Sequence, residues 1–284
     1  MPRLSGPAPI TVGWRAWAPW LGHDGGLRPA KLACLVLVML PLAWLAWAII
    51  GGLGPRPLEW LVKETGRWTM RVLLLALAVT PLRQIAGWQG LGEARRTVGL
   101  AAFAYAVLHL ALWMADQGFL AGRILAEMIG RPALAVGALC LFGLAVLAAT
   151  STDGMLRRLG GRRWRALHRL VYLLAAAGLL HNWLQAARAP YEAVLLSGLY
   201  LWLMGFRLLP AAARRQTGAL LLLGLLSAAL LALAEAVHLH SLAGAPLLLV
   251  LQANLAVETG LRPAVWLLAF ALVAAALPQL GQRR

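Results

Sequence analysis

LHRLVYLLAAAGLLHNW, residues 167–183, is an apolar run of helical length with one histidine near each end, His168 and His181. Its length and composition are typical of a helix that crosses a lipid bilayer. Histidine is costly inside a membrane and ordinary at its surface. The stretch therefore predicts a membrane helix and raises the question of what its two histidines bind.

The composition of the whole chain agrees with a membrane protein. Its 284 residues are 61% hydrophobic and only 13% charged, and the mean hydropathy is +0.75, well outside the balance of a soluble domain. The net charge of +16 could suggest nucleic acid, but the arginines lie in short clusters between apolar segments. This placement favours membrane topology, and we expect no nucleic-acid partner. Cys34 and Cys140 have no zinc-type spacing.

Apolar stretches of about 17–25 residues match the thickness of the hydrocarbon core, about 30 Å. The sequence predicts an all-α fold, a polytopic transmembrane helical bundle. Arg67, Arg71 and Pro81 interrupt the second stretch, so we expect the arginines to lie near an interface or to snorkel towards it. The apolar segment within residues 237–261 is too short to span and predicts a re-entrant or interfacial element. The predicted spans are 31–53, 67–83, 97–116, 132–150, 167–186, 193–210, 217–236 and 262–280.

The distribution of basic residues predicts the orientation of the bundle. With the amino terminus in the cytoplasm, most of the 26 basic residues fall on the cytoplasmic side, so the positive-inside rule places both termini there. The arginines of residues 157–165, expected to form a loop, contribute most to this bias. Together with Arg95 and Arg96 they also make a cationic surface, suited to a flavin phosphate, haem propionates or an acidic donor protein.

Depth along the helices relates His109 to His181. A rise of about 1.5 Å per residue places His181 about 20 Å, and His109 about 18 Å, from the cytoplasmic ends of their spans. Two imidazoles at one level on separate helices are the geometry for axial ligation of a haem iron, with satisfied core histidines as the alternative. We expect Gly99, Gly137, Gly143 and Gly178 to leave room for a porphyrin.

The other histidines have weaker assignments. On one ideal helix, His168 would lie about 140° around the axis from His181, so both cannot ligate the same iron. His168 either serves a second cofactor near the cytoplasmic face or is an interfacial residue. His238 and His240 are at positions i and i+2, a spacing that suits a shared helical face poorly. We interpret them as interface residues rather than a metal site.

Four segments together resemble a known family. They are TGRWTMRVLLLALAVTPLR (65–83), RRTVGLAAFAYAVLHL (95–110), RPALAVGALCLFGLAVLAATST (131–152) and LGGRRWRALHRLVYLLAAAGLLHNW (159–183). The combination of TPLR, RR-x-x-GL, Tyr-x-x-x-His and LHRL-x-Y resembles the MsrQ (YedZ) family. This is the haem-binding membrane subunit of the periplasmic methionine sulfoxide reductase system, within the ferric-reductase-like transmembrane group. The resemblance covers about residues 65–210.

The resemblance implies a multi-pass protein of the bacterial inner membrane that carries haem b, one or two per chain, and FMN. It implies electron transfer to the periplasmic molybdenum enzyme MsrP, and the family's three motif histidines match His109, His168 and His181. Related reductases carry a soluble FAD/NADPH domain, but here no G-x-G-x-x-G unit is present. We therefore expect a separate donor, either a cytoplasmic flavin reductase or the quinol pool.

These expectations divide the chain into four parts. Residues 1–30 form a cytoplasmic segment, and 31–64 form the first span and an outer loop. Residues 65–210 form a six-helix ferric-reductase-like core once the flanking span is counted, and 211–284 form an extension with about two further spans. Two other functions stay open, a transmembrane ferric or quinol reductase with another acceptor and a non-redox transporter whose histidines relay protons or pack.

Overall fold

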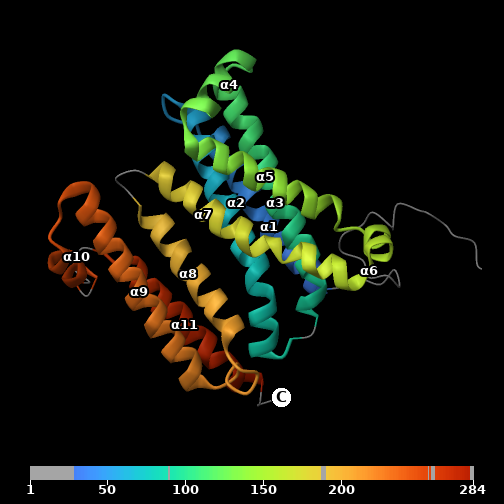
Figure 1. The fold of residues 1–284 in the computed structure, drawn as a ribbon, viewed down its shortest axis with the longest axis vertical. Coiled ribbons are helices and arrows are strands. Elements are labelled where there is room, and N and C mark those ends of the chain that lie inside the picture. The colour runs from blue at the N-terminus through green and yellow to red at the C-terminus, as the bar shows by residue number, and fades with distance from the viewer. Residues whose placement is uncertain (1–28, 89, 187–189, 255, 257–259, 282–284) are drawn as a thin grey trace, which may run out of the picture.

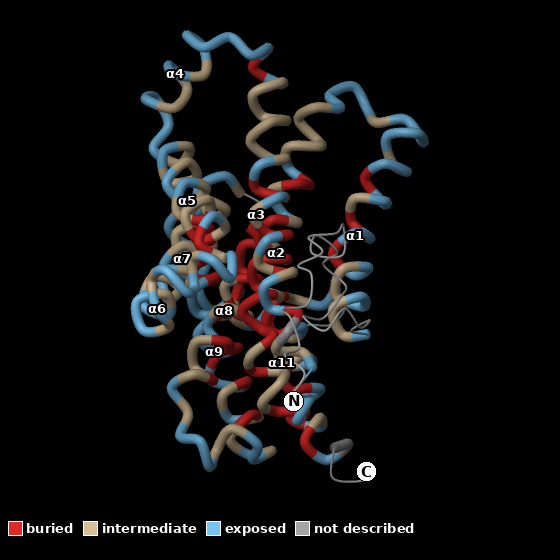
Figure 2. Tube along the Cα trace, turned by 90° about the vertical axis from the view of Figure 1, so that its right-hand side faces the viewer, coloured by how far each residue is buried: buried red, intermediate tan, exposed pale blue. Residues whose placement is uncertain are grey.

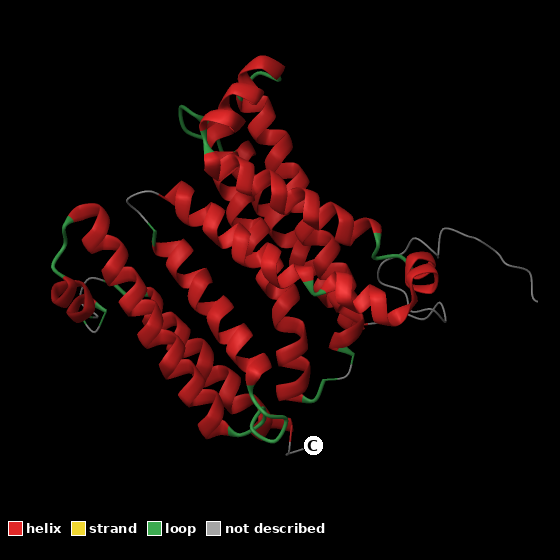
Figure 3. Cartoon of the chain, in the orientation of Figure 1, coloured by secondary structure: helices red, strands yellow, loops and turns green. Residues whose placement is uncertain are grey.

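A computed structural model describes residues 29–88, 90–186, 190–254, 256 and 260–281. The predicted cytoplasmic segment 1–30 lies almost wholly outside these residues. Within the described ranges the regular structure is helical and no strand occurs, which confirms the all-α fold (Figure 3). The helices are α1 (Pro29–Ile50), α2 (Pro57–Ala86), α3 (Leu91–Asp116), α4 (Ala121–Gly130), α5 (Pro132–Ala149), α6 (Asp153–His168), α7 (Leu170–Ala186), α8 (Tyr191–Leu208), α9 (Thr217–Ala243), α10 (Leu247–Ala253) and α11 (Pro263–Gly281).

Each predicted span corresponds to a helix, namely α1, α2, α3, α5, α7, α8, α9 and α11. Among the described residues, α1, α2, α3, α5 and α9 are both long and apolar enough to cross a membrane. The short helix α4 lies at one end of the bundle, and α6 lies at the opposite end of α5 and α7 (Figure 1). We use the α4 end and the α6 end as names for these two ends.

Helix α2 lies at the centre of the bundle and packs against α3, α7, α8 and α11. It begins with Pro57, whose missing N–H is no loss in a first turn. It ends at Gly87, whose φ of 74° suits glycine and whose N–H donates to the carbonyl of Arg83. Leu73, Leu74 and Leu77 on this helix are almost fully buried, and buried residues follow its length in Figure 2.

The outer faces of the helices are apolar and exposed. Leu139 and Phe142 of α5 and Leu173 of α7 each expose about two thirds of their surface. Such a belt would be unfavourable in water but is suited to lipid chains. The two helices predicted after Pro210 pack against α8 and against each other, closely enough that a Cβ on Gly224 of α9 would meet the side chain of Ala271 on α11.

The expected loop at residues 157–165 is wrong, because this segment forms α6. The hydroxyl of Thr152 caps the helix by accepting a hydrogen bond from the N–H of Met155. The negative charge of Asp153 in the first turn interacts favourably with the helix dipole. Gly160 bends α6 with a φ of 75°. His168 is the last residue of α6 rather than part of α7, so its angular relation to His181 cannot be read from one ideal helix.

The carboxyl end of α9 also differs from the prediction. The helix continues beyond residue 236 to Ala243, and His240 lies in its last turn. Gly244, with a φ of 65°, ends the helix, and its N–H donates to the carbonyl of His240. The predicted re-entrant or interfacial segment contains the short helix α10, on which Leu248 and Leu249 are exposed.

Candidate functional site

Two of the candidate histidines face each other within the bundle. The imidazole of His109 on α3 and that of His181 on α7 have ring centres 6.4 Å apart, and their planes make an angle of 79°. Both side chains are half-buried. The two residues are far apart in the chain, and the structure brings them to one level, as their depths predicted.

Each imidazole of this pair is fixed by a backbone carbonyl of a neighbouring helix. Nδ1 of His109 lies 2.9 Å from the carbonyl oxygen of Val62 on α2. Nδ1 of His181 lies 2.7 Å from the carbonyl oxygen of Ala133 on α5. A carbonyl only accepts, so Nδ1 must carry the proton and donate, and Nε2 keeps its lone pair. Both rings therefore have the tautomer that ligates a metal through Nε2.

The spacing of the pair fits one iron between the two Nε2 atoms. Two metal–nitrogen bonds of about 2 Å, with about 1 Å from each nitrogen to its ring centre, give a separation of about 6 Å. The observed distance is 6.4 Å. Among the described residues no three His, Cys, Asp or Glu side chains gather as a metal site. The pair thus offers two protein ligands, the number that a six-coordinate haem iron takes.

His168 lies apart from this pair, at the α6 end. Its ring stacks on Trp164, with ring centres 3.9 Å apart, and its Nε2 lies 3.2 Å from the hydroxyl of Thr150. The indole N–H of Trp164 donates to the carbonyl of Thr150. His168 is therefore held by an aromatic face and a hydroxyl, and the residues around it provide no second imidazole.

A cavity adjoins His168. Its volume is about 380 Å³, and its lining includes Arg95 and Arg96 of α3 together with Trp164. Arg96 forms an ion pair at 2.8 Å with Asp153, which lies in the first turn of α6. The cavity thus combines an aromatic wall, a histidine and cationic groups, which suits a planar molecule that carries negative charge.

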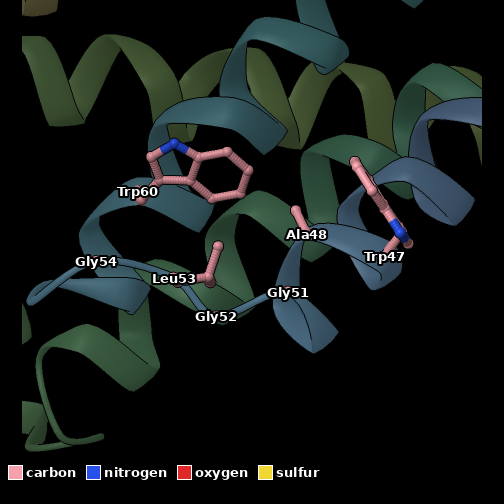
Figure 4. Close-up of a pocket in the computed structure, with 7 residues that line it drawn as sticks. All are labelled: Trp47, Ala48, Gly51, Gly52, Leu53, Gly54 and Trp60. Carbon is pink, nitrogen blue, oxygen red and sulfur yellow. The ribbon is translucent and has the colours of Figure 1, made fainter.

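A second cavity, of about 360 Å³, lies between the end of α1 and the start of α2 (Figure 4). Figure 4 shows the indoles of Trp47 and Trp60 on either side of the Gly51–Gly54 turn. Its lining contains no histidine, cysteine or carboxylate. This cavity supplies no metal ligand and no acid or base.

The arginines of α2 are neutralised by carboxylates rather than left to snorkel alone. Glu192 of α8 forms ion pairs with Arg67 at 3.1 Å and with Arg71 at 2.7 Å, and Glu64 also pairs with Arg67. The sequence prediction placed these arginines near an interface but did not identify Glu192. Its position 121 to 125 residues further along the chain gave no local signal.

The glycines expected to make room for a porphyrin have different neighbours. A Cβ on Gly143 or Gly178 would meet Leu174 or Met70, so these two glycines permit close helix packing. A Cβ on Gly99 would meet nothing within 4 Å. Of these four glycines, Gly137 alone adjoins the histidine pair, where its added Cβ would lie 2.9 Å from Cε1 of His181.

His238 and His240 do not form a metal site with each other. The ring of His238 packs edge-on against Trp183 with centres 4.6 Å apart. Nδ1 of His240 lies 2.9 Å from the carbonyl oxygen of Ala245. These contacts agree with packing and interface roles.

Comparison with known proteins places this helical bundle in a class. The family model for the ferric reductase like transmembrane component matches residues 65–179, which run from α2 into α7, include His109 and His168, and end two residues before His181. The bundle is thus a ferric-reductase-like transmembrane domain, and the chain is a multi-pass membrane protein. No solved structure matches the chain.

Relatives of similar sequence define the family further. A protein of Rhodospirillum rubrum is 42% identical over 193 residues, which cover 67% of this chain and 93% of the relative. A protein of Deinococcus radiodurans is 41% identical over 62% of this chain and 87% of the relative. A protein of Herminiimonas arsenicoxydans is 41% identical over 59% and 78%. Each is named protein-methionine-sulfoxide reductase heme-binding subunit MsrQ. The chain belongs to the MsrQ family.

Proposed function

We propose that this chain is a haem b-binding electron-transfer subunit of a methionine sulfoxide reductase system, with the iron ligated by His109 and His181. One observation carries the proposal: two imidazoles from separate helices face each other at 6.4 Å, each held through Nδ1. The names of the relatives describe haem-binding subunits of such a reductase. The distance and the tautomer agree with what two axial ligands require.

The chain's own residues would tune the bound group. Hydrogen bonds from Nδ1 to the carbonyls of Val62 and Ala133 fix the tautomer and the direction of each ring. The surrounding apolar helices lower the local dielectric, and they orient the two ligands before binding. Haem, when bound, supplies one-electron redox chemistry.

We propose a direction of electron flow from the charge difference between the two ends of the bundle. In our proposal the chain lies in the inner membrane with both termini in the cytoplasm, so the arginine-rich α6 faces the cytoplasm. Electrons enter there from a flavin reductase or from the quinol pool. They leave near the His109–His181 pair towards periplasmic MsrP, which reduces methionine sulfoxide in oxidised proteins.

A second cofactor fits the cavity beside His168. The cavity volume of about 380 Å³, the indole of Trp164 and the guanidinium of Arg95 are suited to an anionic planar group, either a second haem or FMN. Ligation of an iron by Nε2 of His168 would require its hydrogen bond to Thr150 to break. The proposal therefore treats this position as a secondary site.

Absorption spectroscopy of purified protein tests the proposal. We expect a b-type spectrum that sharpens on reduction by dithionite, and its loss or strong reduction in His109→Ala and His181→Ala. His240→Ala is the matched control, because this exposed histidine also has Nδ1 bound to a carbonyl but does not face a second imidazole. A wild type without haem after expression with a haem supply would reject the proposal and favour the non-redox transporter.

The acceptor needs a separate test. We expect the reduced wild type to be reoxidised rapidly by purified MsrP with methionine sulfoxide, and the His181→Ala variant not to be. Rapid reduction of ferric chelates, with no reaction towards MsrP, would instead identify a transmembrane reductase with another acceptor.

A further inference from the structure

The two imidazoles of the pair are held by the same local arrangement, which the chain contains twice. In one half, Nδ1 of His109 meets the carbonyl of Val62, and four residues later along α2 lies Gly66. In the other half, Nδ1 of His181 meets the carbonyl of Ala133, and four residues later along α5 lies Gly137. The separations along the chain from carbonyl to histidine, 47 and 48 residues, are nearly equal.

Each ring lies against the glycine of its own half. A Cβ built on Gly66 would lie 3.0 Å from Cε1 and 3.2 Å from Nδ1 of His109. A Cβ built on Gly137 would lie 2.9 Å from Cε1 and 3.0 Å from Nδ1 of His181. Carbon atoms in favourable contact are about 3.5–4.0 Å apart. Any side chain at either position would therefore push the ring out of place.

The carbonyl and the glycine act on the same ring for a geometric reason. Residues four apart on a helix lie on one face, about 6 Å apart along the axis. An imidazole that donates to the carbonyl of the first residue passes over the second. Only a residue without Cβ allows the ring to come close enough for hydrogen bonds of 2.7–2.9 Å.

We propose that Gly66 and Gly137 are positioning residues for the two axial imidazoles, one in each half of the core. This inference rests on the proposed function, because it assigns the purpose of the arrangement to haem ligation. The two glycines set how far each Nε2 extends from its helix and keep the two ring planes nearly perpendicular, at 79°. A ferric low-spin haem reports that angle, since its electron paramagnetic resonance (EPR) spectrum depends on the relative orientation of the two axial planes.

Substitution of each glycine by alanine tests the inference. We expect Gly66→Ala and Gly137→Ala to bind haem roughly 10-fold or more weakly, the usual cost of losing a partner behind a metal ligand. The haem that remains should show a shifted EPR spectrum and a shifted midpoint potential. A loss of packing alone would lower stability without moving these two signals.

Two other glycines provide matched controls. Gly143→Ala, also on α5, overpacks the same helix pair because its Cβ would meet Leu174, but it does not reach an imidazole. We expect it to lower the melting temperature and leave the EPR spectrum of the bound haem unchanged. Gly218→Ala on α9 places its Cβ in open space, so we expect wild-type haem binding and spectrum.

The outcomes separate this inference from the proposed function. Wild type without haem would reject the proposed function itself. Wild type with haem, and unchanged EPR spectra in folded Gly66→Ala and Gly137→Ala, would reject only the positioning role, as would an equal shift in Gly143→Ala. The wild-type spectrum tests the same point if a variant does not fold: a signal typical of parallel imidazole planes would contradict the perpendicular arrangement.

Discussion

Removal of the charge on Arg262 should strongly destabilise the α9–α11 end of the bundle. The side chain of Glu235 on α9 is only 3% exposed, and among the described residues its polar partners are Arg262 at 3.3 Å and the amide of Asn254 at 3.2 Å. At an effective dielectric constant of about 20, a charge pair at this distance is worth about 5 kcal/mol. Because Arg262 keeps 32% of its side-chain exposure, we expect Arg262→Met to cost about 3 kcal/mol, the lower end for breaking a buried pair.

Thermal unfolding in detergent measures this loss. A cost of about 3 kcal/mol should lower the melting temperature by roughly 5 °C for a chain of this size. Arg56→Met is the matched control, because its pair with Glu59 joins side chains that are 80% and 39% exposed and should contribute less than about 1 kcal/mol. The double variant Arg262→Met, Glu235→Gln should recover much of the loss, since no unpaired buried charge remains.

The reasoning would be refuted if Arg262→Met melted like wild type, or if the double variant lost as much as the two single changes added together. Either result would mean that water or another group already compensates the carboxylate of Glu235. Haem content should stay constant across the series, because neither residue contacts the imidazole pair.

Two more substitutions test other contacts of the core. Glu192→Gln leaves Arg67 and Arg71 of α2 without the carboxylate that reaches them from α8. We expect the free energy of unfolding to fall by about 1–3 kcal/mol. A melting temperature equal to that of wild type would argue against this role of Glu192. Trp164→Ala removes the ring stacked at 3.9 Å on His168, so it should weaken the same cofactor signal as His168→Ala, and the double variant should add nothing beyond either change. Additive losses in the spectra would place the two residues at separate sites.

The level of the histidine pair was predictable from sequence because helices in lipid convert position into depth. His109 and His181 lie in apolar runs that begin on the same side of the membrane, and a constant rise per residue places them together. Their backbone partners were not predictable in this way. The carbonyls of Val62 and Ala133 come from helices 47 and 48 residues away, and every residue carries a carbonyl, so no residue type marks them.

Other features escaped prediction for different physical reasons. Helix α6 was expected to be a loop because it has no continuous apolar run. It is amphipathic and rich in arginine. Its cap at Thr152 was the local signal that could have revealed it. Gly66 was not identified because the second span was predicted to begin at residue 67, whereas α2 begins ten residues earlier, at Pro57.

The helices after Pro210 contribute to the fold differently from the two halves that hold the imidazoles. α9 and α11 pack on α8, and α11 also contacts α2. Trp202 of α8 is fully buried, and its ring packs against Phe206 on α8 and Phe270 on α11. The contact between α8 and α11 is therefore close. In this chain α9 and α11 therefore supply the surface against which α8 is buried.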